Sequence, residues 1–152
     1  MNTKSSEFSE FVLFSEEEVS DLNSRVIMRD SRGKQVPYVI CLVRDKEVQL
    51  KPEEQTRQLW LARLIDKLGY ARSRVAVEYP ITFGRDSSKR ADIVVFDADR
   101  PTVPYVIIEV KQAKYKDGKE QLRSYAHATG APLAVWSDGI LAELCPILGD
   151  AA

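Results

Sequence analysis

Two short apolar segments, residues 91–96 and 104–111, follow one another in the second half of the chain and contain charged residues. Both are rich in valine and isoleucine, so they predict two β-strands. The short polar connection between them favours an antiparallel pair. Asp92 lies inside the first segment, and Glu109 and Lys111 lie inside the second. A charged group buried without a partner is costly, so these three residues need a structural or chemical reason for their position.

Strand and helix patterns also flank this pair. Helical spacing follows Pro52, which suits a first helical position, and Gly69 and Gly130 are placed as C-cap glycines. We expect polar loops at residues 84–90 and 97–102. The expected strands are residues 38–43, 48–50, 75–81, 91–96, 104–111, 133–136 and 140–145, and the expected helices are residues 52–68, residues 119–129 and a short one after Ser15.

The order of these elements predicts the fold class. The three middle strands are joined by short connections, which favours an antiparallel meander. The following strand, helix and strand imply a right-handed crossover and a parallel pair. We therefore expect an α/β fold with a mixed β-sheet, in which a central antiparallel meander is flanked by α-helices.

The length and composition are those of one ordinary globular domain. The 152 residues are 44% hydrophobic and 30% charged, and their apolar runs are far too short to span a bilayer. Residues 1–30 carry seven acidic but only three basic residues. We expect an acidic extension at residues 1–37, the main domain at residues 38–145 and a tail at residues 146–152 that begins a linker.

Charge and cysteine usage narrow the classes of function. The net charge of −1 and the pI near 5.9 argue against a protein that holds nucleic acid by bulk charge alone. Cys41 and Cys145 lack the spacing of metal ligands, so we expect reduced, buried thiols in a cytoplasmic protein. The chain has no GxxxxGK[ST] phosphate loop, which excludes an ATP motor of that type.

Asp92, Glu109 and Lys111 can form a metal-dependent hydrolytic site. Glu109 and Lys111 are two residues apart on one expected strand, so their side chains share a face. A hairpin brings Asp92 alongside them. Two carboxylates can hold a hard cation such as Mg²⁺, and a lysine can position water or stabilise charge on a phosphate. The alternative is a buried ion pair between Lys111 and one of the carboxylates.

Other polar residues could join this site. Glu78 could complete a metal shell, although a solvent-facing strand glutamate explains it almost as well. Glu54 could reach the metal, but favourable electrostatics at a helix start explains it more simply. His127 is the only histidine, which excludes a site built from several histidines. The candidate phosphate contacts near the site are Arg85, Lys89, Arg90, Lys114, Lys116 and Lys119.

The spacing of Asp92 from Glu109-Val110-Lys111 resembles the PD-(D/E)xK nuclease signature. The flanking residues resemble the N-terminal nuclease domain of type I restriction enzyme R subunits more closely. Two departures are Ala91, where the signature has proline, and Thr56, where we expect valine. The stretches that carry the resemblance are residues 51–54, Arg57-Gln58, Gly69-Tyr70, Glu78, residues 90–95, residues 108–111, Gln121 with Tyr125, and Ser137-Asp138-Gly139.

The resemblance implies a restriction-endonuclease-like core and a function. Asp92 and Glu109 would bind Mg²⁺, for which Mn²⁺ can substitute, and Lys111 would be the catalytic lysine. Gln121 and Tyr125 match the QxxxY pattern of this nuclease branch and share a helix face. The implied partners are DNA, a translocase motor in the same or a separate chain, and the modification and specificity subunits.

A non-catalytic DNA-binding or assembly module is the competing interpretation. The acidic first thirty residues and the low pI favour it slightly. The intact set of Asp92, Glu109 and Lys111 argues against it, because a module without chemistry has no need to hold these three residues together. The sequence therefore favours a Mg²⁺-dependent DNA endonuclease domain.

Overall fold

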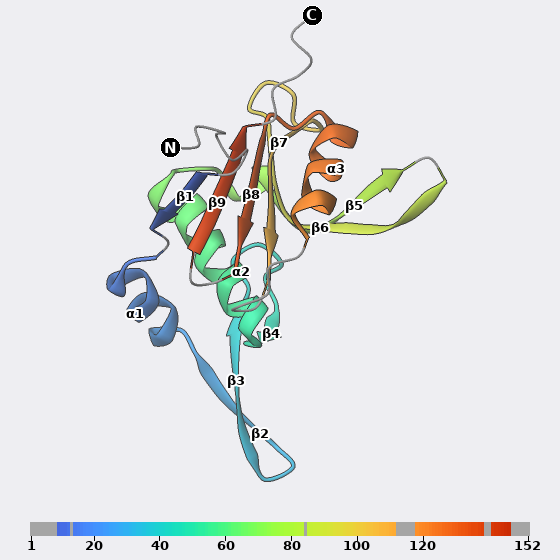
Figure 1. Ribbon diagram of the computed structural model, residues 1–152. Coiled ribbons are helices and arrows are strands. Elements are labelled where there is room, and N and C mark those ends of the chain that lie inside the picture. Colours follow the sequence, from blue (N-terminus) through green and yellow to red (C-terminus); the bar gives the residue numbers. More distant parts are fainter. Residues whose placement is uncertain (1–8, 13, 84, 112–117, 139–140, 147–152) are drawn as a thin grey trace, which may run out of the picture.

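The computed structural model describes residues 9–12, 14–83, 85–111, 118–138 and 141–146, which form two β-sheets and their helices (Figure 1). A six-stranded sheet has the order β1-β9-β8-β7-β6-β5, and a three-stranded sheet has the order β2-β3-β4. The strands are β1 (Ser9–Val12), β2 (Ile27–Ser31), β3 (Lys34–Ile40), β4 (Glu47–Gln49), β5 (Val75–Phe83), β6 (Asp86–Phe96), β7 (Pro104–Val110), β8 (Leu133–Ser137) and β9 (Leu141–Pro146).

Strand directions confirm the predicted α/β fold with a mixed sheet. Strands β5, β6 and β7 form an antiparallel meander, and β7 pairs with β8 in parallel. The helix that connects this parallel pair is α3 (Lys119–Thr129). The other helices are α1 (Glu16–Ser24), α2 (Pro52–Ala62), the π-helical turn η1 (Arg63–Lys67) that continues α2, and the short 3₁₀ helix η2 (Arg72–Arg74).

The start of α2 and both ends of α3 lie where the sequence predicts them, whereas the helix expected to run to residue 68 changes from α2 to the π-helical turn η1 after Ala62. Pro52 is the first residue of α2, where its missing N–H leaves no hydrogen bond unmade. Gly118 and Gly130 flank α3 in the left-handed region, with φ values of +96° and +77°. Few residues other than glycine adopt such angles without strain, so these two glycines set both ends of the helix.

Helices cover both faces of the six-stranded sheet. One apolar cluster joins α2 and η1 to alternate residues of β6 and β7, including Ile93 and Ile108. A second cluster joins α3 to the intervening residues of the same strands, including Val94 and Ile107. Successive strand residues point to opposite faces, so this alternation gives a helix–sheet–helix arrangement of three layers.

The prediction of a polar loop at residues 84–90 is wrong. Strand β6 begins at Asp86 and forms a hairpin arm with β5. Ile81 pairs with Lys89 in this arm, and Pro80 pairs with Arg90. Strand β7 pairs with β6 only from Ile93 onward. The arm therefore projects beyond α3 as a two-stranded ribbon (Figure 1). Such a ribbon has little apolar surface to bury, so its sequence resembles that of a loop.

The first 37 residues also contribute to the folded structure. Strand β1 pairs with β9 at the edge of the large sheet, and β3 crosses the boundary expected between residues 37 and 38. Helix α1 starts with a capping box at Ser15 and Glu18, and Glu18 also pairs with Arg63. The division of the chain into an extension, a domain and a tail remains a prediction. Among the described helices, none has the length and apolar character needed to cross a membrane.

Candidate functional site

Asp92 lies where β6 separates from β7. The last residue pair between the two strands on this side is Ile93 with Ile108. One step further, the Oδ2 atom of Asp92 accepts a hydrogen bond from the main-chain N–H of Val110 at 2.8 Å. The Asp92 side chain thus satisfies a strand N–H that no longer meets a neighbouring carbonyl, and this contact fixes one carboxylate oxygen.

Glu109 is the most perturbed acidic residue of the site. Its side chain is buried, and it lies within hydrogen-bonding reach of Asp92. Burial raises the pKa of Glu109 to about 9, the charge and hydrogen bonding of Asp92 add to this effect, and Lys111 partly opposes it. In the described part of the chain, no donor reaches the buried Oε2 atom of Glu109. Such a pair of facing carboxylates needs a shared proton or a cation.

Lys111 stands beside this carboxylate pair. Its Nζ atom lies 3.6 Å from Oε1 of Glu109. Its main-chain N–H donates to the carbonyl of Ser137 at 2.7 Å, which anchors the end of β7 to β8. Gly118 lies against the Lys111 side chain, because a Cβ atom at Gly118 would be 2.8 Å from Cε of Lys111. The glycine that starts α3 therefore leaves the space that the lysine occupies.

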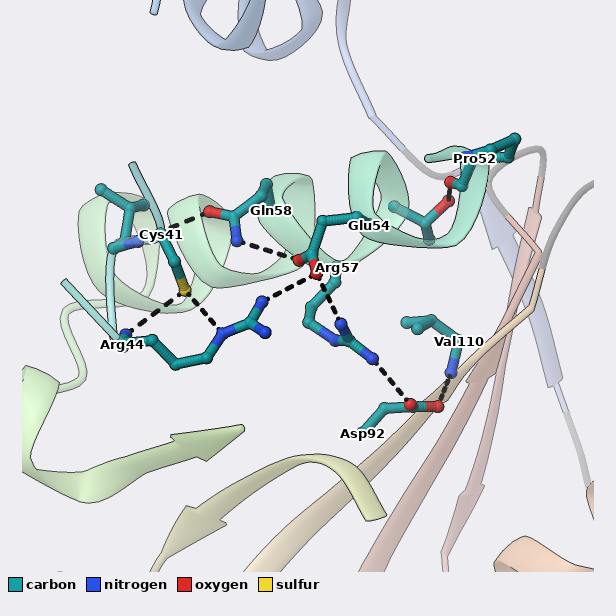
Figure 2. A network of polar contacts seen from close by, with 10 residues as sticks. Cys41, Arg44, Pro52, Glu54, Arg57, Gln58, Asp92 and Val110 are labelled. Atoms are coloured by element: carbon teal, nitrogen blue, oxygen red, sulfur yellow. Dashed lines mark hydrogen bonds and ion pairs between the residues drawn. The ribbon is translucent and has the colours of Figure 1, made fainter. Parts of the chain in front are cut away.

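Arg57 reaches the site from α2 and links two carboxylates. One guanidinium nitrogen donates to Oδ1 of Asp92 at 2.9 Å, and another donates to Oε1 of Glu54 at 2.7 Å. Figure 2 shows this bridge from the helix to the strand. The side chain of Arg57 is only 9% exposed. Sequence reasoning missed this role, although Arg57 belongs to the stretches that carry the family resemblance.

Glu54 is the centre of a buried network rather than an isolated helix-start residue. It accepts hydrogen bonds from Arg57, from Arg44 at 2.8 Å and from Gln58 at 3.1 Å (Figure 2). The main chain and side chain of Arg44 each donate to Sγ of Cys41 at 3.3 Å. The network therefore runs from a buried thiol to Asp92. Glu54 balances two arginines, which explains its burial better than the helix start does.

Burial and hydrogen bonding have opposite effects on the Cys41 thiol. Burial raises its pKa, but hydrogen bonds from Arg44, Gln58 and Val43 lower it below the ordinary value. Cys41 and Cys145 are both buried and neither forms a disulfide, as the sequence predicts.

Glu78 lies opposite Asp92 in the hairpin register. It falls between the pairs Val77 with Ile93 and Tyr79 with Ala91, and its φ angle of +54° is unusual for a residue other than glycine. Its side chain is exposed and lines a cleft of about 350 Å³ together with Arg57. Among the described residues, no cluster of three or more His, Cys, Asp or Glu side chains is placed to hold a metal ion. A metal role for Glu78 remains a prediction.

Gln121 and Tyr125 lie on the side of the sheet covered by α3. Gln121 is half-buried in the first turn of the helix, which begins beside Lys111. Tyr125 is 3% exposed and packs in the cluster that contains Ala91 and Trp136. The structure therefore gives Tyr125 a packing role in addition to the predicted one, which remains a prediction.

The basic residues predicted to contact DNA have different surroundings. Arg85, Lys89 and Arg90 are exposed on the β5–β6 arm. Lys119 is already paired with Glu143 and lies 4.8 Å from the centre of the Trp136 ring. Lys114 and Lys116 lie outside the described residues. Of the described residues in this set, those on the arm are the exposed ones, and their contact with phosphate remains a prediction.

The donor set fits a hard divalent cation. Asp92 and Glu109 offer carboxylate oxygens, the ligands that Mg²⁺ prefers, and Mg²⁺ commonly uses only one or two carboxylates together with water and phosphate. Among the described residues, the buried Oε2 atom of Glu109 has no hydrogen-bond donor, and a carboxylate oxygen is the kind of ligand that such a cation takes. The structure therefore brings Asp92, Glu109 and Lys111 together, and their role as metal ligands and catalytic lysine remains a prediction.

Comparison with known proteins identifies the family of the chain. A search of curated proteins found no match. The family model of the type I restriction enzyme R protein N terminus matches residues 52–150, a range that includes Arg57, Asp92, Glu109, Lys111 and α3. The match covers well over half of the chain, and the chain therefore belongs to the family of type I restriction enzyme R protein N-termini.

Proposed function

We propose that the chain is a Mg²⁺-dependent DNA endonuclease domain of the PD-(D/E)xK type, the cleavage module of a type I restriction-modification system. One observation carries this proposal. Two carboxylates, Asp92 and Glu109, meet beside Lys111 at the point where β6 and β7 separate. Asp92 is paired with Arg57, and Lys111 lies 3.6 Å from Glu109, but the two carboxylates still lie against each other, which raises the cost of burying a charged Glu109. A bound cation would remove that cost.

The residues of the site have separate roles in the proposed reaction. Asp92 and Glu109 would hold the cation through their oxygens, and Glu109 would give up its proton when the cation binds. When bound, Mg²⁺ polarises the phosphate and lowers the pKa of an attacking water. Lys111 would orient that water and stabilise the negative charge that develops on the phosphate oxygens. Gln121 would position substrate from the start of α3.

The β5–β6 arm is the proposed contact for the DNA backbone. Arg85, Lys89 and Arg90 lie on a hairpin whose base contains Asp92, so phosphates held by the arm would lead toward the site. The described strands and helices contain no base-reading motif that we recognise. Target choice would therefore depend on specificity and modification subunits, and delivery of DNA would depend on a translocase motor.

A plasmid cleavage assay tests the proposal. Wild-type protein, Lys111→Ala and Lys34→Ala are each incubated with supercoiled plasmid, with Mg²⁺, with Mn²⁺ and with a chelator. Lys34 is an exposed lysine on β3, on the other sheet, and serves as the matched control. We expect cleavage by wild type and Lys34→Ala only with metal, and none by Lys111→Ala.

Three results would contradict the proposal. Cleavage by Lys111→Ala at the wild-type rate would reduce Lys111 to an ion-pair partner of Glu109. Metal-independent cleavage by all three proteins would point to a contaminating nuclease. Duplex binding without cleavage, under all metal conditions, would favour a non-catalytic DNA-binding module.

A further inference from the structure

We propose that Arg57 is a positioning residue of the cleavage site, which holds the Asp92 carboxylate in its working orientation from an anchor on Glu54. This inference rests on the proposed nuclease function and assigns it a residue outside the Asp92, Glu109 and Lys111 set. Arg57 comes from α2, whereas those three residues come from β6 and from the end of β7. The proposal therefore gives α2 a role in the reaction beyond covering the sheet.

The first argument is geometric. Asp92 has two oxygens, and each has its own donor: Val110 N–H at 2.8 Å for Oδ2 and Arg57 at 2.9 Å for Oδ1. One bond alone would leave the carboxylate free to rotate about the bonded oxygen. Two bonds from different elements fix its plane, and a metal ligand must be held in place to within about half an ångström for efficient catalysis.

The second argument concerns the anchor. Arg57 can hold Asp92 only if its own guanidinium is fixed, and Glu54 binds a different nitrogen of the same group at 2.7 Å. Glu54 is fixed in turn by Arg44 and Gln58 (Figure 2). The rigid, planar fork of an arginine suits this bridge between two carboxylates, and a lysine cannot reproduce its geometry.

The third argument is electrostatic. Charges alternate along the network from Arg44 through Glu54 and Arg57 to Asp92. An arginine next to Asp92 repels a divalent cation, and Glu54, which Arg57 shares with Arg44, offsets part of this charge. The network therefore orients Asp92 while Glu54 reduces the repulsion that Arg57 exerts on a cation at the site.

A comparison of Arg57→Lys and Arg57→Met with wild type tests this role. Mn²⁺ affinity is measured by calorimetry, cleavage is measured at saturating Mn²⁺, and folding is checked by thermal unfolding. Arg63→Met is the matched control, because Arg63 follows α2 directly and pairs with Glu18 rather than with the site. If Arg57→Met does not fold, Arg57→Lys, which keeps the charge, decides the question.

We expect the two Arg57 variants to keep Mn²⁺ binding and to cleave DNA more slowly. Arg57→Lys should bind Mn²⁺ within about threefold of wild type, since the charge and Val110 N–H remain, but should cleave at least about tenfold more slowly. Arg57→Met should bind Mn²⁺ at least as tightly as wild type, because a positive charge is gone, and should cleave more slowly still. Arg63→Met should match wild type in both measurements.

Three outcomes would overturn the inference. Cleavage by Arg57→Lys at the wild-type rate would show that the fork geometry is not needed. An equal loss of Mn²⁺ affinity and cleavage in Arg57→Lys would show that Arg57 only builds the metal site. If wild type itself neither binds Mn²⁺ nor cleaves, the proposed function fails and this assignment fails with it, which is distinguishable from a failure confined to the Arg57 variants.

Discussion

Oδ2 of Asp92 accepts the main-chain N–H of Val110 at 2.8 Å, across the gap that opens between β6 and β7. A side chain thereby completes the hydrogen bonding of a strand and at the same time becomes fixed beside Glu109. This dual role means that Asp92 contributes to stability as well as to the proposed chemistry, and it gives the first prediction.

Asp92→Ala should lower the free energy of unfolding by about 1–3 kcal/mol in the absence of metal, because it leaves Val110 N–H and Arg57 without their acceptor. Urea denaturation measures this change. Asp21→Ala is the control, since Asp21 also pairs with an arginine, Arg25, but its side chain is 58% exposed. The control should change stability by no more than about 0.5 kcal/mol. Equal effects would refute the structural role of Asp92.

The stability of the metal-free protein should fall as pH rises from about 5 to 9. Glu109 has an ordinary pKa of 4.5 when unfolded and about 9 when folded, so the folded state holds a proton that the unfolded state has lost. The stabilisation is complete below the unfolded pKa and is lost as pH rises through the folded one. Glu109→Gln should remove most of this slope in denaturation experiments with a chelator.

Glu120→Gln controls for the loss of a glutamate, because Glu120 is exposed on α3 and its side chain is 84% accessible. This variant should keep the slope of the wild type. A Glu109→Gln variant with the wild-type slope would mean that Glu109 is ionised in the folded protein.

Gly118→Ala should lower the cleavage rate in addition to a modest loss of stability. The added methyl group would lie 2.8 Å from Cε of Lys111, so the flexible lysine must move away. Gly130→Ala is a close control, because Gly130 also has a positive φ and no atom lies within 4 Å of its added Cβ. Each substitution should lower stability by about 1 kcal/mol through backbone strain. Only Gly118→Ala should lower the cleavage rate, and equal rates would contradict the placement of Lys111.

The isolated chain should bind duplex DNA weakly and with little sequence preference. With a net charge of −1, only local basic residues can neutralise phosphates, and we expect a dissociation constant of about 10⁻⁴ to 10⁻⁶ M at physiological salt. Replacing both Arg85 and Lys89 by alanine should reduce the slope of log affinity against log salt by about 2. Fluorescence anisotropy across a salt series measures this slope, and nanomolar, sequence-selective binding would contradict the prediction.

The sequence predicts that Asp92, Glu109 and Lys111 lie together, because their placement depends on local strand and hairpin geometry. Glu109 and Lys111 share a strand face through the two-residue period, and a short hairpin brings Asp92 beside them. The ends of α3 are equally predictable, since Gly118 and Gly130 are needed there for their φ angles.

The residues that hold the site in place contact residues that are far away along the chain. Local sequence patterns do not reveal such contacts. Arg57 is 35 residues from Asp92 in the chain, and nothing in the spacing of α2 indicates that its guanidinium reaches a strand. The outer part of β6 was also missed, because an exposed two-stranded arm has the composition of a loop. The arginine–glutamate motif of α2 was nevertheless visible as part of the family resemblance.

Calorimetric titration with Mn²⁺ tests the central claim most directly, because it reports on the metal site whether or not DNA is cut. Wild type, Asp92→Ala and Glu109→Gln are titrated at one pH in two buffers that differ in ionisation enthalpy. We predict that wild type binds Mn²⁺ and releases a proton from Glu109, and that both variants lose binding. Undiminished Mn²⁺ binding by both variants, or no binding by wild type, would contradict a metal site at Asp92 and Glu109.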